Sequence, residues 1–95
     1  MMIAVYAVAV VKPEHIDTFK TLVNSLVEAS RQDKGCVSYQ LGTVAGKENT
    51  FAFVEQWQSM ADLETHTQQA HFTQAVEKFA DLLSQSLDIN VVELF

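Results

Sequence analysis

The sequence contains little cysteine and little positive charge. Its 95 residues include a single cysteine, Cys36, so no internal disulfide can form, and we expect a protein of the reducing cytoplasm. Six basic residues stand against 12 acidic residues, which gives a formal net charge of −6. Such a chain repels phosphates and anionic lipid headgroups. We therefore expect neither a nucleic acid nor a membrane surface as a partner.

Long hydrophobic runs and common cofactor motifs are also absent. The apolar start, MMIAVYAVAVV, lacks the basic region and cleavage site of a signal peptide and continues directly into Lys12-Pro13. No apolar run approaches the roughly 20 residues of a membrane-spanning helix. The chain has no glycine-rich phosphate loop, no nucleophile elbow and no Cys-x-x-Cys pair. These absences predict a protein without a nucleotide, metal or other cofactor site.

What the chain does contain is one series of strand and helix patterns, which predicts a single domain over residues 1–95. Both alternating sets of residues 3–11 are apolar, which predicts a strand buried on both faces. Helical spacing predicts a helix from Pro13 to about Arg31, with Gly35 as its stop signal. The other predicted elements are strands over about 37–43, 50–58 and 88–95, a helix over about 60–67 capped by Ser59 with Asp62, and a helix over about 71–86.

The order β-α-β-β-α-β predicts an α+β fold of the ferredoxin-like, split β-α-β type. Both helices of this fold cover the same face of the sheet and leave the other face open. The first strand is apolar on both sides, and Ala52 and Val54 lie opposite the aromatic side of the third strand. An open face of this kind would be a large apolar patch, so we predict a homodimer joined through the sheets.

The candidate chemistry lies in residues 51–72. Strand alternation places Phe51, Phe53, Glu55 and Trp57 on one face. The aromatic side chains could line a pocket for a flat ligand, or they could be ordinary packing between sheet and helix. Glu55 favours a pocket, because a carboxylate in register with three aromatic residues must be paired, lie at a strand end or face a wet cavity.

The histidines and tyrosines offer further candidates. His66 could be a general base or a hydrogen-bond donor to a substrate oxygen, or simply a histidine at a helix end. His66 and His71 lack the i, i+4 spacing of a helical metal pair, so we predict no metal site, and for His71 we favour a neutral capping role. Tyr39 could donate to a ligand or be a core residue at a wet edge. Cys36 is predicted to be a small, half-buried side chain.

These segments resemble the antibiotic biosynthesis monooxygenase (ABM) family of small dimeric α+β-barrel proteins, over nearly the whole chain. Within that family the chain is most similar to the bacterial branch that includes quinol monooxygenases. Many relatives have Thr-Pro before the second histidine, where this chain has Gln69-Ala70, so the bend between the helices is fixed less rigidly. The resemblance lies in Val11-Lys12-Pro13-Glu14, Lys34-Gly35-Cys36-Val37-Ser38-Tyr39, Glu48-Asn49-Thr50-Phe51, Glu55-Gln56-Trp57, Ala61-Asp62-Leu63-Glu64-Thr65-His66 and Ala70-His71-Phe72.

The resemblance implies a cofactor-independent monooxygenase that oxidises a small aromatic quinol or phenol with O2. A base would remove a phenolic proton, the anion would pass an electron to O2, and a dry cavity would hold the radical pair. The resemblance assigns the base, or a hydrogen-bond donor, to His66. The substrate-binding residues it implies are Trp57, Phe51, Phe53, Phe72, Tyr39 and Glu55.

Other activities of the same fold stay open as alternatives. Haem-degrading relatives carry an asparagine in the first strand, and Ala4 to Val11 contains none, which disfavours haem breakdown. Arg31 is the only arginine, so the isomerase activity of a relative that handles a phosphorylated sugar has little support. A non-catalytic dimer that binds a small molecule and sequesters a reactive aromatic compound is the second hypothesis.

Overall fold

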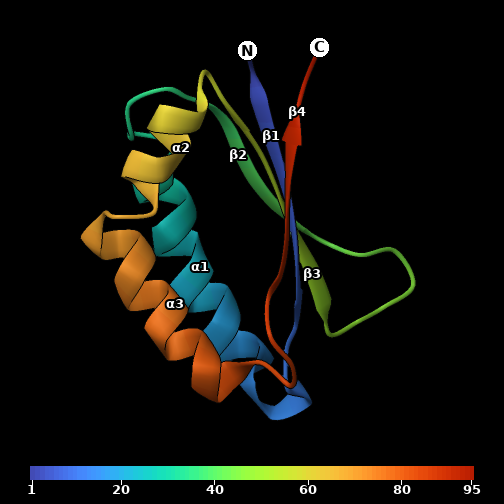
Figure 1. Ribbon diagram of the computed structural model, residues 1–95. Helices are drawn as coiled ribbons and strands as arrows, with labels where there is room; N and C mark the ends of the chain where they lie inside the picture. The colour runs from blue at the N-terminus through green and yellow to red at the C-terminus, as the bar shows by residue number, and fades with distance from the viewer.

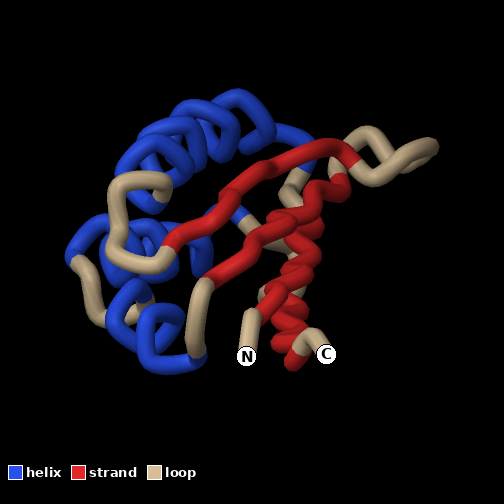
Figure 2. Tube along the Cα trace, turned by 90° about the horizontal axis from the view of Figure 1, so that it is seen from above, coloured by secondary structure: helices blue, strands red, loops and turns tan.

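The two central strands of the sheet supply most of the residues that meet the helices. A computed structural model describes residues 1–95. Its elements are β1 (Ile3–Val10), the 3-10 helix η1 (Pro13–His15), α1 (Ile16–Ser30), β2 (Cys36–Thr43), β3 (Thr50–Trp57), α2 (Met60–His66), α3 (Ala70–Leu82) and β4 (Asp88–Glu93). The strands form one antiparallel sheet in the order β2-β3-β1-β4. All the helices cover the same face of this sheet, which confirms the predicted ferredoxin-like α+β fold (Figures 1 and 2).

Alternation along β1 and β3 decides which side chains enter the core. Every second residue of β1 from Ile3 to Ala9 is buried under the helices, whereas Tyr6 is exposed on the open face. Antiparallel pairing sets Ile3 beside Trp57 and Ala9 beside Phe51, so the aromatic side of β3 joins the same buried layer. The prediction that β1 is buried on both faces is not met within one chain, because no helix covers the outward face.

The helices pack through amphipathic stripes. α1 buries Phe19, Val23 and Leu26 among others, and α3 buries Ala75 and Phe79. Phe19 and Phe79 meet with ring centroids 5.7 Å apart, which joins the two helices above the sheet. No helix is both long enough and apolar enough to cross a membrane.

The last helix ends earlier than its periodicity predicts. α3 stops at Leu82, because Leu83 adopts extended backbone angles and pairs with Val11 just beyond β1. The N–H of Ser84 then donates to the carbonyl of Val10 at 2.9 Å. Leu83 is still buried, but from an extended segment, so pairing with the end of β1 prevails over helical spacing.

The turn between α1 and β2 also differs from expectation. α1 ends at Ser30, and Gly35 shapes the entry into β2 instead of ending the helix. Gly35 has a φ of +79°, and a Cβ at this position would overlap the side chain of Asp62. Asp62 is held by the predicted capping box, in which its N–H donates to Ser59 Oγ at 3.2 Å and Ser59 Oγ donates to its carboxylate at 3.0 Å. Gly35 therefore lets the turn lie directly against the start of α2.

We expect Gly35→Ala to lower the free energy of unfolding by about 2 kcal/mol or more. A left-handed backbone costs a non-glycine residue about 1 kcal/mol, and the displaced Asp62 adds to that cost. Gly46→Ala is the matched control, because Gly46 has a φ of +81° with no atom near its would-be Cβ. Urea denaturation measures both variants. Equal losses in the two would show that the overlap with Asp62 is harmless.

Candidate active site

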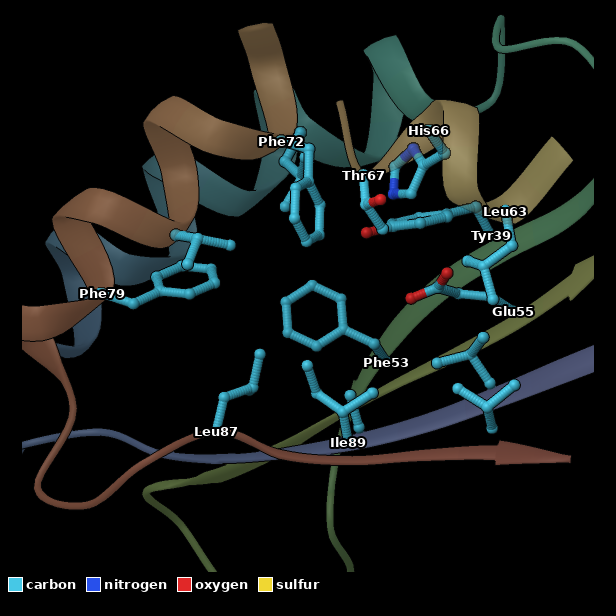
Figure 3. A pocket seen from close by; sticks show the side chains of 15 residues that line it. Tyr39, Phe53, Glu55, Leu63, His66, Thr67, Phe72, Phe79, Leu87 and Ile89 are labelled. Carbon is cyan, nitrogen blue, oxygen red and sulfur yellow. The ribbon is translucent and has the colours of Figure 1, made fainter. Parts of the chain in front are cut away.

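A cavity of about 100 Å³ lies between the helices and the inner face of the sheet. Of its 15 lining residues, 12 are hydrophobic, so a bound molecule meets mainly apolar walls. Figure 3 shows that oxygen- and nitrogen-bearing side chains gather at one end of the cavity. This polar end comprises His66, Thr67, Tyr39 and Glu55, and the apolar end includes Phe53, Phe72, Phe79, Leu87 and Ile89.

The cavity opens between α3 and the edge strand β4. Four of its lining residues are exposed, namely Thr67 at the polar end and Val76 of α3, Ile89 and Val91 of β4 along an apolar rim. Residues farther in, such as Tyr39 and Phe53, are buried. A ligand can therefore enter past an apolar rim and reach the polar end inside.

At the polar end, one carboxylate oxygen binds two histidines. His66 closes α2 and places Nδ1 2.7 Å from Oδ2 of Asp33, while His71 of α3 places Nε2 2.8 Å from the same oxygen. Asp33 belongs to the turn between α1 and β2. Because an ionised carboxylate only accepts hydrogen bonds, both nitrogens donate to it. In its neutral form, His66 therefore carries its hydrogen on Nδ1 and leaves a lone pair on Nε2.

The Nε2 atom of His66 is buried and has no hydrogen-bond partner in the chain. Leaving such an atom unpaired costs about 1–3 kcal/mol, so a ligand hydroxyl that reaches it gains a favourable contact. Burial lowers the pKa of His66, although the hydrogen bond and charge of Asp33 raise it in opposition. At neutral pH the ring is therefore uncharged and can accept a proton at Nε2.

Glu55 and Tyr39 add two groups of perturbed acidity. Burial raises the pKa of Glu55 to about 7, against a lowering by the Trp57 hydrogen bond. Burial, and then the charge of Glu55, raise the pKa of the Tyr39 hydroxyl, which stays protonated at neutral pH. The cavity therefore offers a neutral hydroxyl beside a carboxyl group that is partly protonated near neutrality.

Two of the predicted pocket residues lie behind the cavity wall. Trp57 is fully buried, donates from Nε1 to Oε1 of Glu55 at 2.9 Å and packs against the ring of His66 with centroids 4.6 Å apart. Phe51 packs on Phe19 at 5.1 Å, elsewhere in the core. The expectation that Trp57 and Phe51 line the pocket is corrected: Trp57 supports the groups that do, and Phe51 is core.

The cavity wall does contain the other candidates, namely Phe53, Phe72, Tyr39, Glu55 and His66. The capping role expected of His71 is wrong, because Gln69 is the residue before α3 and the imidazole binds Asp33 instead. Cys36 is half-buried as predicted, and burial raises the pKa of its thiol.

Asp33 is the residue that the sequence patterns missed. It lies 33 positions from His66 in the chain, and no local motif marks it. One carboxylate oxygen of Asp33 and one ring nitrogen of each histidine lie within 4.8 Å of one another, and atoms of these kinds can also be ligands of divalent transition metals. Both nitrogen–oxygen separations are hydrogen-bond distances, however, so we interpret the cluster as two histidines hydrogen-bonded to one carboxylate. The fold and this site define a small α+β protein with an acid–base group facing an apolar ligand cavity.

Several known proteins are similar to this chain in sequence and fold. The antibiotic biosynthesis monooxygenase family matches residues 2–78. A Bacillus subtilis protein named "Putative monooxygenase YcnE" is 40% identical over 93 residues, which cover 98% of each chain. A crystal structure described as an antibiotic biosynthesis monooxygenase matches with a TM-score of 0.91 and 30% identity over 98% of each chain. A conserved protein from Methanosarcina mazei Go1 matches with a TM-score of 0.95 at 26% identity, covering 98% of this chain and 92% of that one. The chain belongs to the antibiotic biosynthesis monooxygenase family, which confirms the resemblance.

The raised pKa of Glu55 predicts a specific dependence of stability on pH. A carboxyl group whose pKa in the folded protein exceeds its ordinary value of 4.5 contributes fully to stability below pH 4.5. This contribution decreases as the pH rises and is lost at about pH 7. We expect the unfolding free energy of the wild type to fall, relative to that of Glu55→Gln, by up to about 3 kcal/mol between about pH 4 and pH 8.

Urea denaturation across this range measures the effect, with Glu64→Gln as the control because Glu64 is an exposed glutamate of α2. A constant difference between wild type and Glu55→Gln over the whole range would contradict the raised pKa.

Proposed function

We propose that this protein is a cofactor-independent monooxygenase that oxidises a small aromatic quinol or phenol with O2. Family membership supports a function of the monooxygenase type. The observation that carries the proposal is the unpaired Nε2 of His66 at the polar end of an apolar cavity. A phenolic hydroxyl is weakly acidic and sits on a flat apolar ring, so it matches both halves of this site.

The first step is the removal of a proton. Nε2 of His66 accepts the phenolic proton, and the ring becomes an imidazolium beside the Asp33 carboxylate. Tyr39, whose hydroxyl stays protonated and which also lines the polar end, would donate to the substrate oxygen as negative charge develops there. Deprotonation turns a poor electron donor into an electron-rich anion.

The oxidation then follows without any further reactant. The anion passes one electron to O2, and the resulting superoxide and substrate radical combine at a ring carbon to form a peroxide. Loss of the proton on that carbon, with cleavage of the O–O bond, releases water and leaves a new carbonyl group. For a quinol, the balance is quinol plus O2 to hydroxyquinone plus water. The apolar walls keep water away from the radical pair.

Cavity size sets a limit on the substrate. An apolar cavity of about 150 Å³ is known to hold benzene, and the present cavity is about 100 Å³ with an open rim. A benzene-sized ring would therefore fill the cavity and reach its open rim, and any second ring or substituent would extend past Val76 and Ile89 toward solvent. Monocyclic quinols, catechols and the terminal ring of naphthoquinols are the compounds that meet this limit.

We also propose that the working form is a homodimer joined through the open sheet faces. Val54 of β3 is 49% exposed, and its register neighbours on that face are Tyr6 and Gln40. The outward residues of the two central strands carry no charge, and the exposed Tyr6 and Val54 form an uncovered, mainly apolar surface in the middle of the sheet. A second copy would cover it with the same residues.

Oxygen consumption tests the proposed activity. We expect metal-free protein to show saturable O2 uptake with naphthoquinols or catechols above autoxidation, and His66→Gln to lower kcat by about 100-fold or more because the base is lost. His15→Gln, in η1 and outside the cavity, is the matched control. Uptake unaffected by His66→Gln would remove His66 from the mechanism. No uptake, with the same compounds still quenching the fluorescence of Trp57, would favour the non-catalytic binding protein.

Sedimentation tests the dimer. We expect the wild type to sediment as a dimer at micromolar concentration and Val54→Lys to sediment as a monomer, because a lysine there buries a charge in the interface. Met60→Lys is the control, since Met60 is an exposed apolar residue of α2 on the helical side. A monomeric wild type would contradict the proposal.

A further inference from the structure

We infer that Asp33 is the positioning residue for His66 and that His71, on the same carboxylate oxygen, limits the negative charge that His66 receives. The inference rests on the proposed function for its kinetic meaning, but its structural content concerns only these three side chains. Asp33 touches no substrate in this scheme; it acts through the imidazole of His66. Neither Asp33 nor His71 was a candidate for chemistry on sequence grounds.

Orientation is the first contribution of Asp33. A neutral imidazole can carry its hydrogen on either nitrogen, and only the Nδ1–H form leaves a lone pair at Nε2 for a substrate proton. The acceptor at 2.7 Å from Nδ1 selects this form. The rings of Trp57 and Phe72, with centroids 4.6 Å and 5.1 Å from that of His66, restrict rotation of the imidazole.

Charge balance is the second contribution. The side chain of His66 is 1% exposed, so the imidazolium formed by proton uptake has almost no access to water. A buried cation without a partner is strongly unfavourable, and the Asp33 carboxylate supplies that partner in direct contact. Loss of the carboxylate would therefore lower the basicity of His66 and would also remove the preference for its Nδ1–H tautomer.

His71 also binds the carboxylate of Asp33 and so shares its negative charge with His66. Its Nε2 lies 2.8 Å from Oδ2 of Asp33, and its side chain is 27% exposed, against 12% for Asp33 and 1% for His66. When His71 is protonated, its positive charge opposes protonation of His66 across the shared oxygen, which lowers the pKa of His66. The charge on the more exposed histidine therefore affects the proton affinity of the buried one.

The other groups around His66 do not replace this arrangement. Tyr39 of β2 packs edge-on against the imidazole, with centroids 5.6 Å apart, and remains a neutral hydroxyl. Glu55 of β3 accepts a hydrogen bond from Nε1 of Trp57, and it is the Trp57 ring that packs against the imidazole. Asp33 is therefore the one carboxylate in hydrogen-bond contact with His66.

Two substitutions separate the roles because they shift His66 in opposite directions. Asp33→Asn removes the negative charge, so the pKa of His66 falls and both neutral tautomers become populated. His71→Gln keeps a neutral N–H donor to Asp33 but removes the competing positive charge, so the pKa of His66 rises while the Nδ1–H tautomer persists. A general disturbance of the structure would not produce opposite signs.

Nitrogen-15 NMR of the histidine side chains across a pH titration measures both quantities on the substrate-free protein, with Asp17→Asn on the exposed side of α1 as the control. We expect Nε2 of neutral His66 to show the shift of an unprotonated nitrogen in the wild type, in His71→Gln and in the control. In Asp33→Asn, we expect an intermediate shift. Unchanged tautomer and pKa in Asp33→Asn, or equal shifts of one sign in Asp33→Asn and His71→Gln, would overturn the inference.

The kinetic arm uses O2 uptake against pH. We expect Asp33→Asn to lower the plateau kcat at least about tenfold and to move the acid limb to lower pH, and His71→Gln to move that limb to higher pH. Absence of uptake together with the expected NMR result would defeat the proposed function and leave the positioning role intact. If Asp33→Asn fails to fold, His71→Gln still decides the sign of the shift. A wild-type titration altered by a chelator would show a metal at the cluster and would also overturn the inference.

Discussion

The Oδ2 atom of Asp33 ties together three segments that are distant in the chain. It accepts hydrogen bonds from the end of α2 and the start of α3, while its own residue lies in the turn that leads into β2. Gly35 allows this turn to lie against α2, because any Cβ there would meet Asp62. The orientation of His66 toward the cavity depends on this contact, and the acid–base character of the site depends on that orientation.

The cavity itself results from unequal coverage of the sheet. α1 and α3 pack on each other and over the central strands, and the Phe19 ring of α1 contacts both Phe51 of β3 and Phe79 of α3. The edge strand β4 lies outside this cover, so its inward residues Ile89 and Val91 are exposed along the rim. A fully covered β4 would close the rim and leave a packed core. The ligand space is therefore a consequence of two helices spanning a sheet of four strands.

Polar groups at the inner end distinguish this site from ordinary core. Glu55 is held by Trp57 and His66 is held by Asp33, so each has one polar atom engaged, and both side chains lie at the polar end of the cavity. Both gain unusual acidity from burial, in opposite senses: the pKa of Glu55 is raised and that of His66 is lowered. Near neutral pH His66 is therefore uncharged and Glu55 is partly protonated, which suits proton exchange with a neutral aromatic substrate.

By itself the sequence determined the order of elements, the buried aromatic side of β3 and the capping box at Ser59, because these follow from local periodicity and hydrogen bonding. It also pointed to His66 and Glu55 through their place among aromatic residues. Only the tertiary structure decided that Trp57 lies behind the wall, that α3 ends at Leu82 and that Asp33 joins both histidines. These facts depend on contacts between residues distant in the chain, whose register and direction no local pattern specifies.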